Sequence, residues 1–95
     1  MPRAYIISRV DVVDPEAYAL YVAAATKAIA DHGGRPLVRG GRSEALEGPA
    51  RARNAILEFA DYDTARRYYH SQQYQIAKAM RAGAAQIEMV LVEGV

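Results

Sequence analysis

The sequence contains no cysteine and no tryptophan, and phenylalanine occurs once. Without cysteine, a disulfide scaffold and thiolate metal sites are excluded. The apolar segment at residues 4–7 is interrupted by Ser8 and Arg9. It is far shorter than the roughly 20 residues of a membrane span, and it is also too short for the apolar part of a signal peptide. We therefore expect a cytoplasmic protein without a membrane partner.

An excess of either charge is also missing. Twelve Lys and Arg residues are balanced by eleven Asp and Glu residues, so the net charge is +1. A nucleic-acid binder normally carries a clustered basic excess, because neutralising phosphates dominates its affinity. The charge balance therefore predicts no nucleic-acid partner.

Motifs for metal and nucleotide binding are absent from the sequence. His32 and His70 do not form the H-x-x-x-H spacing of a zinc site. No G-x-x-x-x-G-K-[ST] phosphate loop is present, and the Gly33-Gly34 pair follows a predicted helix where a phosphate loop would precede one. We expect no metal, no nucleotide and no other cofactor.

The length of 95 residues predicts one domain, residues 1–95. A chain of this size buries only about 60–65% of the surface that its unfolded state exposes, so its core is thin. Since no covalent cross-link is available, we expect a second copy of the chain to bury further apolar surface.

The first half of the chain predicts a strand and then a helix. Residues 3–12 are rich in β-branched and aromatic residues, as strands are. Asp14 is a good N-cap, and Pro15 suits the first helical position because no N–H is needed there. Apolar residues then recur at helical spacing until Gly33-Gly34, which predicts the end of the helix. Alanine fills most of the later positions, so this helix could lie close to a sheet.

The second half predicts two strands, two short helices and a last strand. Gly40-Gly41 interrupts the first of these strands as either a turn or a bulge. The predicted elements are a strand at 35–40 continuing at 42–47, a strand at 53–59, a helix from Asp61 to Tyr69, a helix capped by Ser71 and running to about residue 82, and a strand at 86–92.

This β-α-β-β-α-β order predicts an α+β protein of the ferredoxin-like, split βαβ arrangement. Its antiparallel sheet carries helices on one face and leaves the other face bare and partly apolar. Two such faces can cover each other, so we expect a homodimer with its sheets face to face, in the manner of a dimeric α/β barrel.

An ordered set of short motifs supports this arrangement. The motifs are Asp14-Pro15-x-x-Tyr18-x-x-Tyr21, Gly33-Gly34-Arg35-x-Leu37-x-Arg39-Gly40-Gly41, Leu46-Glu47-Gly48, Glu58-Phe59 and Tyr69-x-Ser71-x-x-Tyr74-Gln75, ending near Arg81. Over nearly its whole length the chain resembles DUF1330, a domain-of-unknown-function family of the dimeric α/β-barrel superfamily. The resemblance implies a ferredoxin-like protomer that pairs into a barrel. It implies no particular activity, because the superfamily includes cofactor-free monooxygenases, lactone isomerases and haem enzymes.

Four residues are candidates for a ligand site. Arg39 lies in an apolar strand, where its guanidinium could hold a carboxylate or could form a structural ion pair with Glu47 or Glu58. Glu58 lies between Leu57 and Phe59 and is a weak candidate for a catalytic acid or base. Seven of the eight aromatic residues are tyrosine, and Tyr21 and Tyr69 are the two that we expect to line a pocket.

Two functions remain open from the sequence alone. In the first, a homodimer binds, and could also transform, a small organic ligand held by Arg39, Tyr21, Tyr69 and Glu58. In the second, the chain is an interaction or structural module without a ligand, and Arg39 pairs with Glu58. A polar cavity inside the fold would favour the first function, and a filled core would favour the second.

Overall fold

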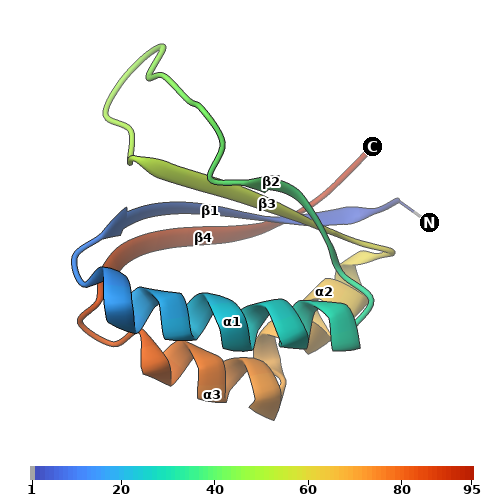
Figure 1. Cartoon of the computed structure of the whole chain (residues 1–95). Coiled ribbons are helices and arrows are strands. Elements are labelled where there is room, and N and C mark those ends of the chain that lie inside the picture. Colours follow the sequence, from blue (N-terminus) through green and yellow to red (C-terminus); the bar gives the residue numbers. More distant parts are fainter. Residues whose placement is uncertain (1) are drawn as a thin grey trace.

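The computed structural model describes residues 2–95 and shows one sheet with three helices on one face (Figure 1). The ferredoxin-like fold predicted from the sequence is confirmed, with the second helical region divided in two at Ser71. In chain order the elements are β1 (Ala4–Val12), α1 (Pro15–Asp31), β2 (Arg35–Arg39), β3 (Arg53–Phe59), α2 (Tyr62–His70), α3 (Gln72–Met80) and β4 (Ala85–Glu93).

Each helix begins at the N-cap that the sequence predicts. The Asp14 carboxylate accepts a hydrogen bond from the Ala17 N–H at 3.3 Å, and Asp61 accepts one from the Thr64 N–H at 2.8 Å. The Ser71 hydroxyl likewise accepts from the Tyr74 N–H at 3.1 Å, which starts α3 directly after α2. These side chains satisfy backbone N–H groups that a first helical turn leaves without partners.

The sheet is antiparallel with the strand order β2-β3-β1-β4. Side chains alternate between its two faces. Ile6 of β1 faces the helices with its partners Leu57 and Leu91, whereas Ile7 faces the other way with Ile56 and Val90. We call the face without helices the open face. No helix in residues 2–95 is both long and apolar enough to cross a membrane.

The helices lie at different distances from the sheet. α2 lies close to β1, β3 and β4, whereas α1 packs mainly against α3 and approaches the strands less closely. The alanines of α1 therefore do not bring it into close contact with the sheet, contrary to the sequence-based expectation. Ala28 is fully buried, and Ala25 lines a cavity instead of touching a strand. Short side chains such as alanine leave empty space when the helix backbone does not move closer to the sheet.

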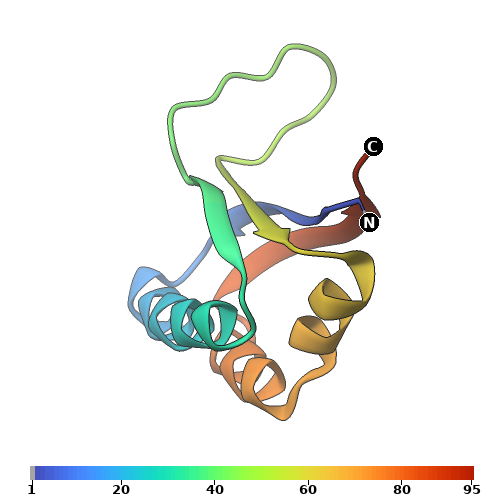
Figure 2. The same cartoon turned by 90° about the vertical axis from the view of Figure 1, so that its right-hand side faces the viewer.

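The prediction that residues 42–47 continue the second strand is wrong. β2 ends at Arg39, and Gly40 turns the chain away with a positive φ of 67° while its N–H donates to the Asn54 carbonyl at 2.8 Å. Because β3 begins at Arg53, opposite this turn, later residues have no strand to pair with. Residues 40–52 instead form a long loop on the side of the sheet away from the helices (Figure 2).

Aromatic residues fill the core between the sheet and the helices. Tyr68, Tyr74 and Phe59 are the largest side chains that are fully buried. Their rings are stacked in a chain, with centroids 5.1 Å apart for Phe59 and Tyr68 and 5.0 Å apart for Tyr68 and Tyr74. Tyrosine rings therefore fill core positions that leucine, isoleucine and valine occupy in most small domains.

Candidate functional site

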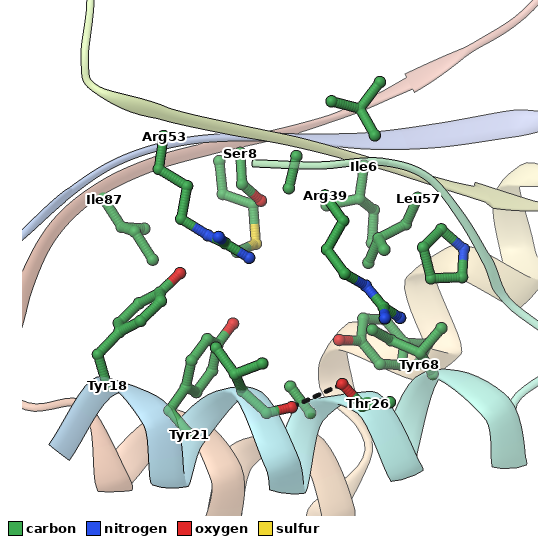
Figure 3. Close-up of a pocket in the computed structure, with 17 residues that line it drawn as sticks. Ile6, Ser8, Tyr18, Tyr21, Thr26, Arg39, Arg53, Leu57, Tyr68 and Ile87 are labelled. Atoms are coloured by element: carbon green, nitrogen blue, oxygen red, sulfur yellow. Dashed lines mark hydrogen bonds between the residues drawn. The ribbon is translucent and has the colours of Figure 1, made fainter. Parts of the chain in front are cut away.

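A cavity of about 70 Å³ lies between α1 and the sheet, where α1 stands away from the strands (Figure 3). About 10–15 Å³ is enough for one water molecule, so the cavity can hold a small ligand group together with water. Every strand contributes to its wall. The lining residues are Ile6, Ser8, Tyr18, Tyr21, Val22, Ala25, Thr26, Ile29, Pro36, Val38, Arg39, Arg53, Ala55, Leu57, Tyr68, Ile87 and Met89.

A β-bulge directs Arg39 toward this cavity. Pro36 pairs with Leu57, but Val38 pairs with Ile56, so β2 has one extra residue, Leu37, at this point. The extra residue reverses the alternation of the strand. Arg39 then pairs with Ala55, whose side chain faces the helices, and its guanidinium lies above α1 beside Tyr68 (Figure 3). The bulge thus lies three residues before Gly40, whereas Gly40 itself forms the turn that was one of the two alternatives predicted there.

Arg53 is the second arginine of the cavity, and the sequence analysis missed it. Its guanidinium extends from β3 into the space above α1, with Cζ 5.9 Å from the centre of the Tyr18 ring (Figure 3). Its Nε is buried without a hydrogen-bond partner. Strand alternation was the available signal, because Arg53 shares the helix-facing side of β3 with Ala55, Leu57 and Phe59.

Neither cavity arginine has an acidic partner among residues 2–95. Other arginines do have partners: Arg35 and Arg3 approach Glu58, and Arg51 bridges Asp11 and Glu88. No carboxylate lines the cavity. The cavity therefore carries two positive charges that the protomer itself does not neutralise.

Tyrosine hydroxyls form the lower wall of the cavity. The Tyr21 and Tyr74 hydroxyls are 2.9 Å apart and share a hydrogen bond, and the Arg81 guanidinium lies over the Tyr21 ring at 5.0 Å. Burial raises the pKa of Tyr21 far above its ordinary value, and the nearby Tyr74 raises it further. Burial likewise raises the pKa of Tyr68. These phenols therefore stay neutral at physiological pH and can act as hydrogen-bond donors.

The four residues predicted from the sequence are not gathered in one place. Tyr21 and Arg39 line the cavity together. Glu58 is on the open face, where its Oε1 accepts a 2.8 Å hydrogen bond from Arg35 Nη2. Within one protomer the Arg39–Glu58 ion pair considered from the sequence therefore does not form, because the two side chains point to opposite faces of the sheet.

Tyr69 lies in a second hollow, between α2 and β4, and its hydroxyl accepts a 3.1 Å hydrogen bond from Lys78 Nζ. Ile6 and Met89 line both this hollow and the cavity under α1, so they separate the two. Among residues 2–95 no group of three or more acidic or histidine residues is placed to hold a metal ion.

Comparison with known families identifies the chain. Residues 3–95 match the family described as domain of unknown function DUF1330. The chain belongs to this family. The match spans all the elements of the fold, so the DUF1330 resemblance seen in the sequence motifs is confirmed. No curated protein sequence matches the DUF1330 chain described here.

Solved structures show the same fold at low sequence identity. A protein of unknown function from Rhodopseudomonas palustris is similar at 17% identity and a TM-score of 0.78, over 99% of this chain and 83% of that one. SnoaB, a cofactor-independent oxygenase from Streptomyces nogalater, is similar at 14% identity and a TM-score of 0.68, over 100% and 95%. A dimeric ferredoxin-like protein of unknown function from Jannaschia is similar at 16% and 0.68, over 97% and 99%.

Proposed function

We propose that this DUF1330 protein binds a small organic molecule in the cavity between α1 and the sheet, and that it does so as a homodimer, without metal or nucleotide. The cavity itself is the observation that carries the proposal. Apolar walls from four strands and two helices meet a few polar groups, which is the usual composition of a small-molecule site. Arg39 and Tyr21, two of the residues predicted from the sequence, both line it.

The lining supports binding more directly than chemistry. It contains no carboxylate and no imidazole, so proton transfer there would depend on the hydroxyls of Ser8, Thr26 and the tyrosines. Glu58, the acid or base considered from the sequence, cannot reach this cavity within one protomer because it lies on the open face. We therefore place Arg39 and Tyr21 in the proposed binding site and leave Glu58 and Tyr69 outside it.

An apolar row across the open face supports the homodimer. Val38, Ile56, Ile7 and Val90 are consecutive partners in the register of the sheet and point to the same side. Val90 is 53% exposed, at the middle of β4. The flanking rows each carry charged residues, Arg35 and Glu58 on one side and Arg9 and Glu88 on the other, although the first row also includes Tyr5 and Val92. An apolar centre with a charged rim is the common pattern of a subunit interface.

The alternative of an interaction module without a ligand has less support. It assumed a filled core and an Arg39–Glu58 pair. Instead, the space beneath the sheet includes the cavity, and Glu58 pairs with Arg35 and Arg3. A homodimer formed through the open face is compatible with both functions. The two functions therefore differ in whether the cavity holds a ligand.

Native mass spectrometry on protein purified gently from its source tests the proposal. We expect a dimer with additional non-covalent mass. The Ala25→Leu variant should lose that mass, because three added carbons at a cavity-lining position of α1 fill part of the space. Ala23→Leu is the matched control: it makes the same substitution on the exposed side of the same helix and should keep the mass.

Three results would contradict the proposal, in whole or in part. A wild-type dimer without additional mass, which also binds no member of a library of small organic molecules, would favour the interaction module. Additional mass that survives Ala25→Leu would place the ligand elsewhere in the protein. A monomer at micromolar concentration would reject the dimer but would leave the cavity to be tested by the same variants.

A further inference from the structure

The geometry points to an organic anion as the ligand of this cavity, a molecule with one carboxylate group and an apolar body. Arg53 would hold the carboxylate, and Arg39 adds a second positive charge at another part of the wall. The inference rests on the proposed function, since it names the chemical class of the molecule that the cavity binds. It goes further because it assigns the main anchor to Arg53, a residue that the sequence analysis did not single out.

The charge of the cavity is the first argument. Two guanidinium groups line a space of about 70 Å³ that no carboxylate lines. A buried or half-buried charge is normally compensated within the protein, as Arg51 is by Asp11 and Glu88. Arg53, which is half-buried, has no such compensation in residues 2–95. A bound anion would supply it.

The geometry of Arg53 is the second argument. Its Nε is buried and has no hydrogen-bond acceptor, although a buried donor without a partner costs about 1–3 kcal/mol. Nε and one terminal nitrogen of a guanidinium form the planar fork that fits the two oxygens of a carboxylate. Nε is covered by protein atoms, so a carboxylate would first engage the terminal nitrogens and would supply the missing acceptor for Nε once the covering side chains move aside.

The surroundings keep Arg53 in place. The Tyr18 ring lies beneath its guanidinium, with 5.9 Å between Cζ and the ring centre. The Gly40 backbone also lies so close to the guanidinium that a methyl group on Gly40 would collide with Nη1. A side chain held between a ring and a backbone loses less freedom when it binds a ligand than an exposed arginine does. This placement favours an anchoring role.

The remaining walls define the other half of the ligand. Ile6, Leu57, Ile87 and Met89 cover the sheet side, and Val22 and Ile29 cover the helix side. These groups cannot hydrogen-bond, so only the hydroxyls of Ser8, Thr26 and the tyrosines are left for further polar atoms of a ligand. A half-buried guanidinium group in the wall of a mainly apolar space therefore suits a monoanion with a hydrocarbon or aromatic body better than a phosphorylated or polyhydroxylated compound.

Benzoate and benzamide are suitable probes, because they have the same shape and differ in charge. NMR titrations of the wild-type protein should show benzoate binding at least tenfold more tightly than benzamide. Arg53→Gln should reduce the affinity for benzoate at least tenfold and change the affinity for benzamide little. Arg67→Gln makes the same change of charge on the exposed surface of α2 and should leave both affinities unchanged.

Arg39→Gln provides a second variant if Arg53→Gln does not fold, because the Arg39 side chain is exposed and its loss does not disturb the core. It should weaken benzoate binding several-fold. Equal binding of benzoate and benzamide, with both lost in Ala25→Leu, would overturn the anion inference and leave the proposed function standing. Failure of both probes to bind at millimolar concentration would count against the cavity as a ligand site and so against both proposals.

Discussion

The hydroxyl groups of Tyr21 and Tyr74 lie 2.9 Å apart and join α1 to α3 by a hydrogen bond inside the core. Both side chains are buried, so each hydroxyl depends on the other for a partner. Arg81 Nη2 adds a longer contact of 3.4 Å to the Tyr74 oxygen. The pair therefore connects the helix that forms the floor of the cavity to the helix behind it.

Removing both of these hydroxyls should cost less than the sum of the two single losses. We expect Tyr74→Phe to lower the free energy of unfolding by about 1 kcal/mol, because the buried Tyr21 hydroxyl loses its partner. In the double variant Tyr21→Phe/Tyr74→Phe, the second substitution should lower the free energy of unfolding by less than it does in the wild-type protein. Urea unfolding of the four proteins gives the coupling energy. Tyr62→Phe is the control on a partly exposed ring, and strictly additive losses would show that the hydrogen bond contributes nothing.

The buried phenols predict a loss of stability at high pH. Burial raises the pKa of Tyr21 and Tyr68 in the folded protein, whereas an unfolded tyrosine has a pKa of about 10. Above pH 10 the unfolded chain therefore releases protons that the folded chain retains. The contribution of the two buried phenols to stability is complete below pH 10 and is lost as the pH rises toward their pKa in the folded state.

Tyr68→Phe tests this dependence, since Tyr68 has a raised pKa and its replacement removes one titrating group. Between pH 10 and 11.5 the free energy of unfolding of Tyr68→Phe should fall less steeply with pH than that of the wild type. The two slopes should differ by up to about 1.4 kcal/mol per pH unit. The Tyr62→Phe control should keep the wild-type slope. Equal slopes in all three proteins would mean that Tyr68 ionises in the folded state at its ordinary pKa.

The partner of Glu58 can be tested by thermodynamic coupling. A double-mutant cycle on Arg35→Gln and Glu58→Gln should give a coupling energy of about 0.5–1 kcal/mol, because their charged groups are 2.8 Å apart and Arg35 is largely exposed. The cycle on Arg39→Gln and Glu58→Gln should be additive within about 0.5 kcal/mol in the protomer. A larger coupling of Glu58 to Arg39 than to Arg35 would contradict the register described for β2.

Two glycines separate backbone strain from the position of Arg53. Gly40 and Gly48 both have positive φ, 67° and 71°, so alanine should cost about 1 kcal/mol of stability at either. Only at Gly40 would the new methyl group collide with the Arg53 guanidinium, because nothing lies near Gly48. Gly40→Ala should therefore weaken benzoate binding several-fold, and Gly48→Ala should not. The same loss of affinity in both variants would indicate a general effect of the loop.

A charge on the open face should separate the proposed dimer. Val90→Glu places a carboxylate in the apolar row across the sheet, where burial against a second copy would be costly. Size-exclusion chromatography with light scattering should show a monomer. Ile76→Glu, at an equally exposed apolar position on α3, should remain a dimer. If Val90→Glu stays dimeric and Ile76→Glu does not, the copies meet through the helices.

Local signals in the sequence were sufficient for the order of the elements. Asp14, Asp61 and Ser71 cap their helices because a short polar side chain satisfies backbone groups only a few residues away. The bounds of β3 were predicted correctly for a similar reason, because the strand propensity of a segment is read from its own residues. The DUF1330 family was likewise recognised from motifs that can be read along the chain.

The site depended on contacts between strands. A single extra residue at Leu37 turns Arg39 toward α1, and nothing local distinguishes this bulge from an ordinary strand. Residues 42–47 were predicted to continue β2, but β3 begins too late to pair with them. Arg53 became a site residue only when the register showed which face of β3 it occupies.

The sequence by itself thus determined the helices, most of the strands and the ferredoxin-like order, because capping and periodicity act over a few neighbouring residues. Only the tertiary structure decided that Arg39 and Arg53 share a cavity with Tyr21 while Glu58 pairs with Arg35 on the opposite face. The reason is geometric. The face that a strand residue occupies changes with every shift of one residue in register, and register is set by a partner strand far away in the chain.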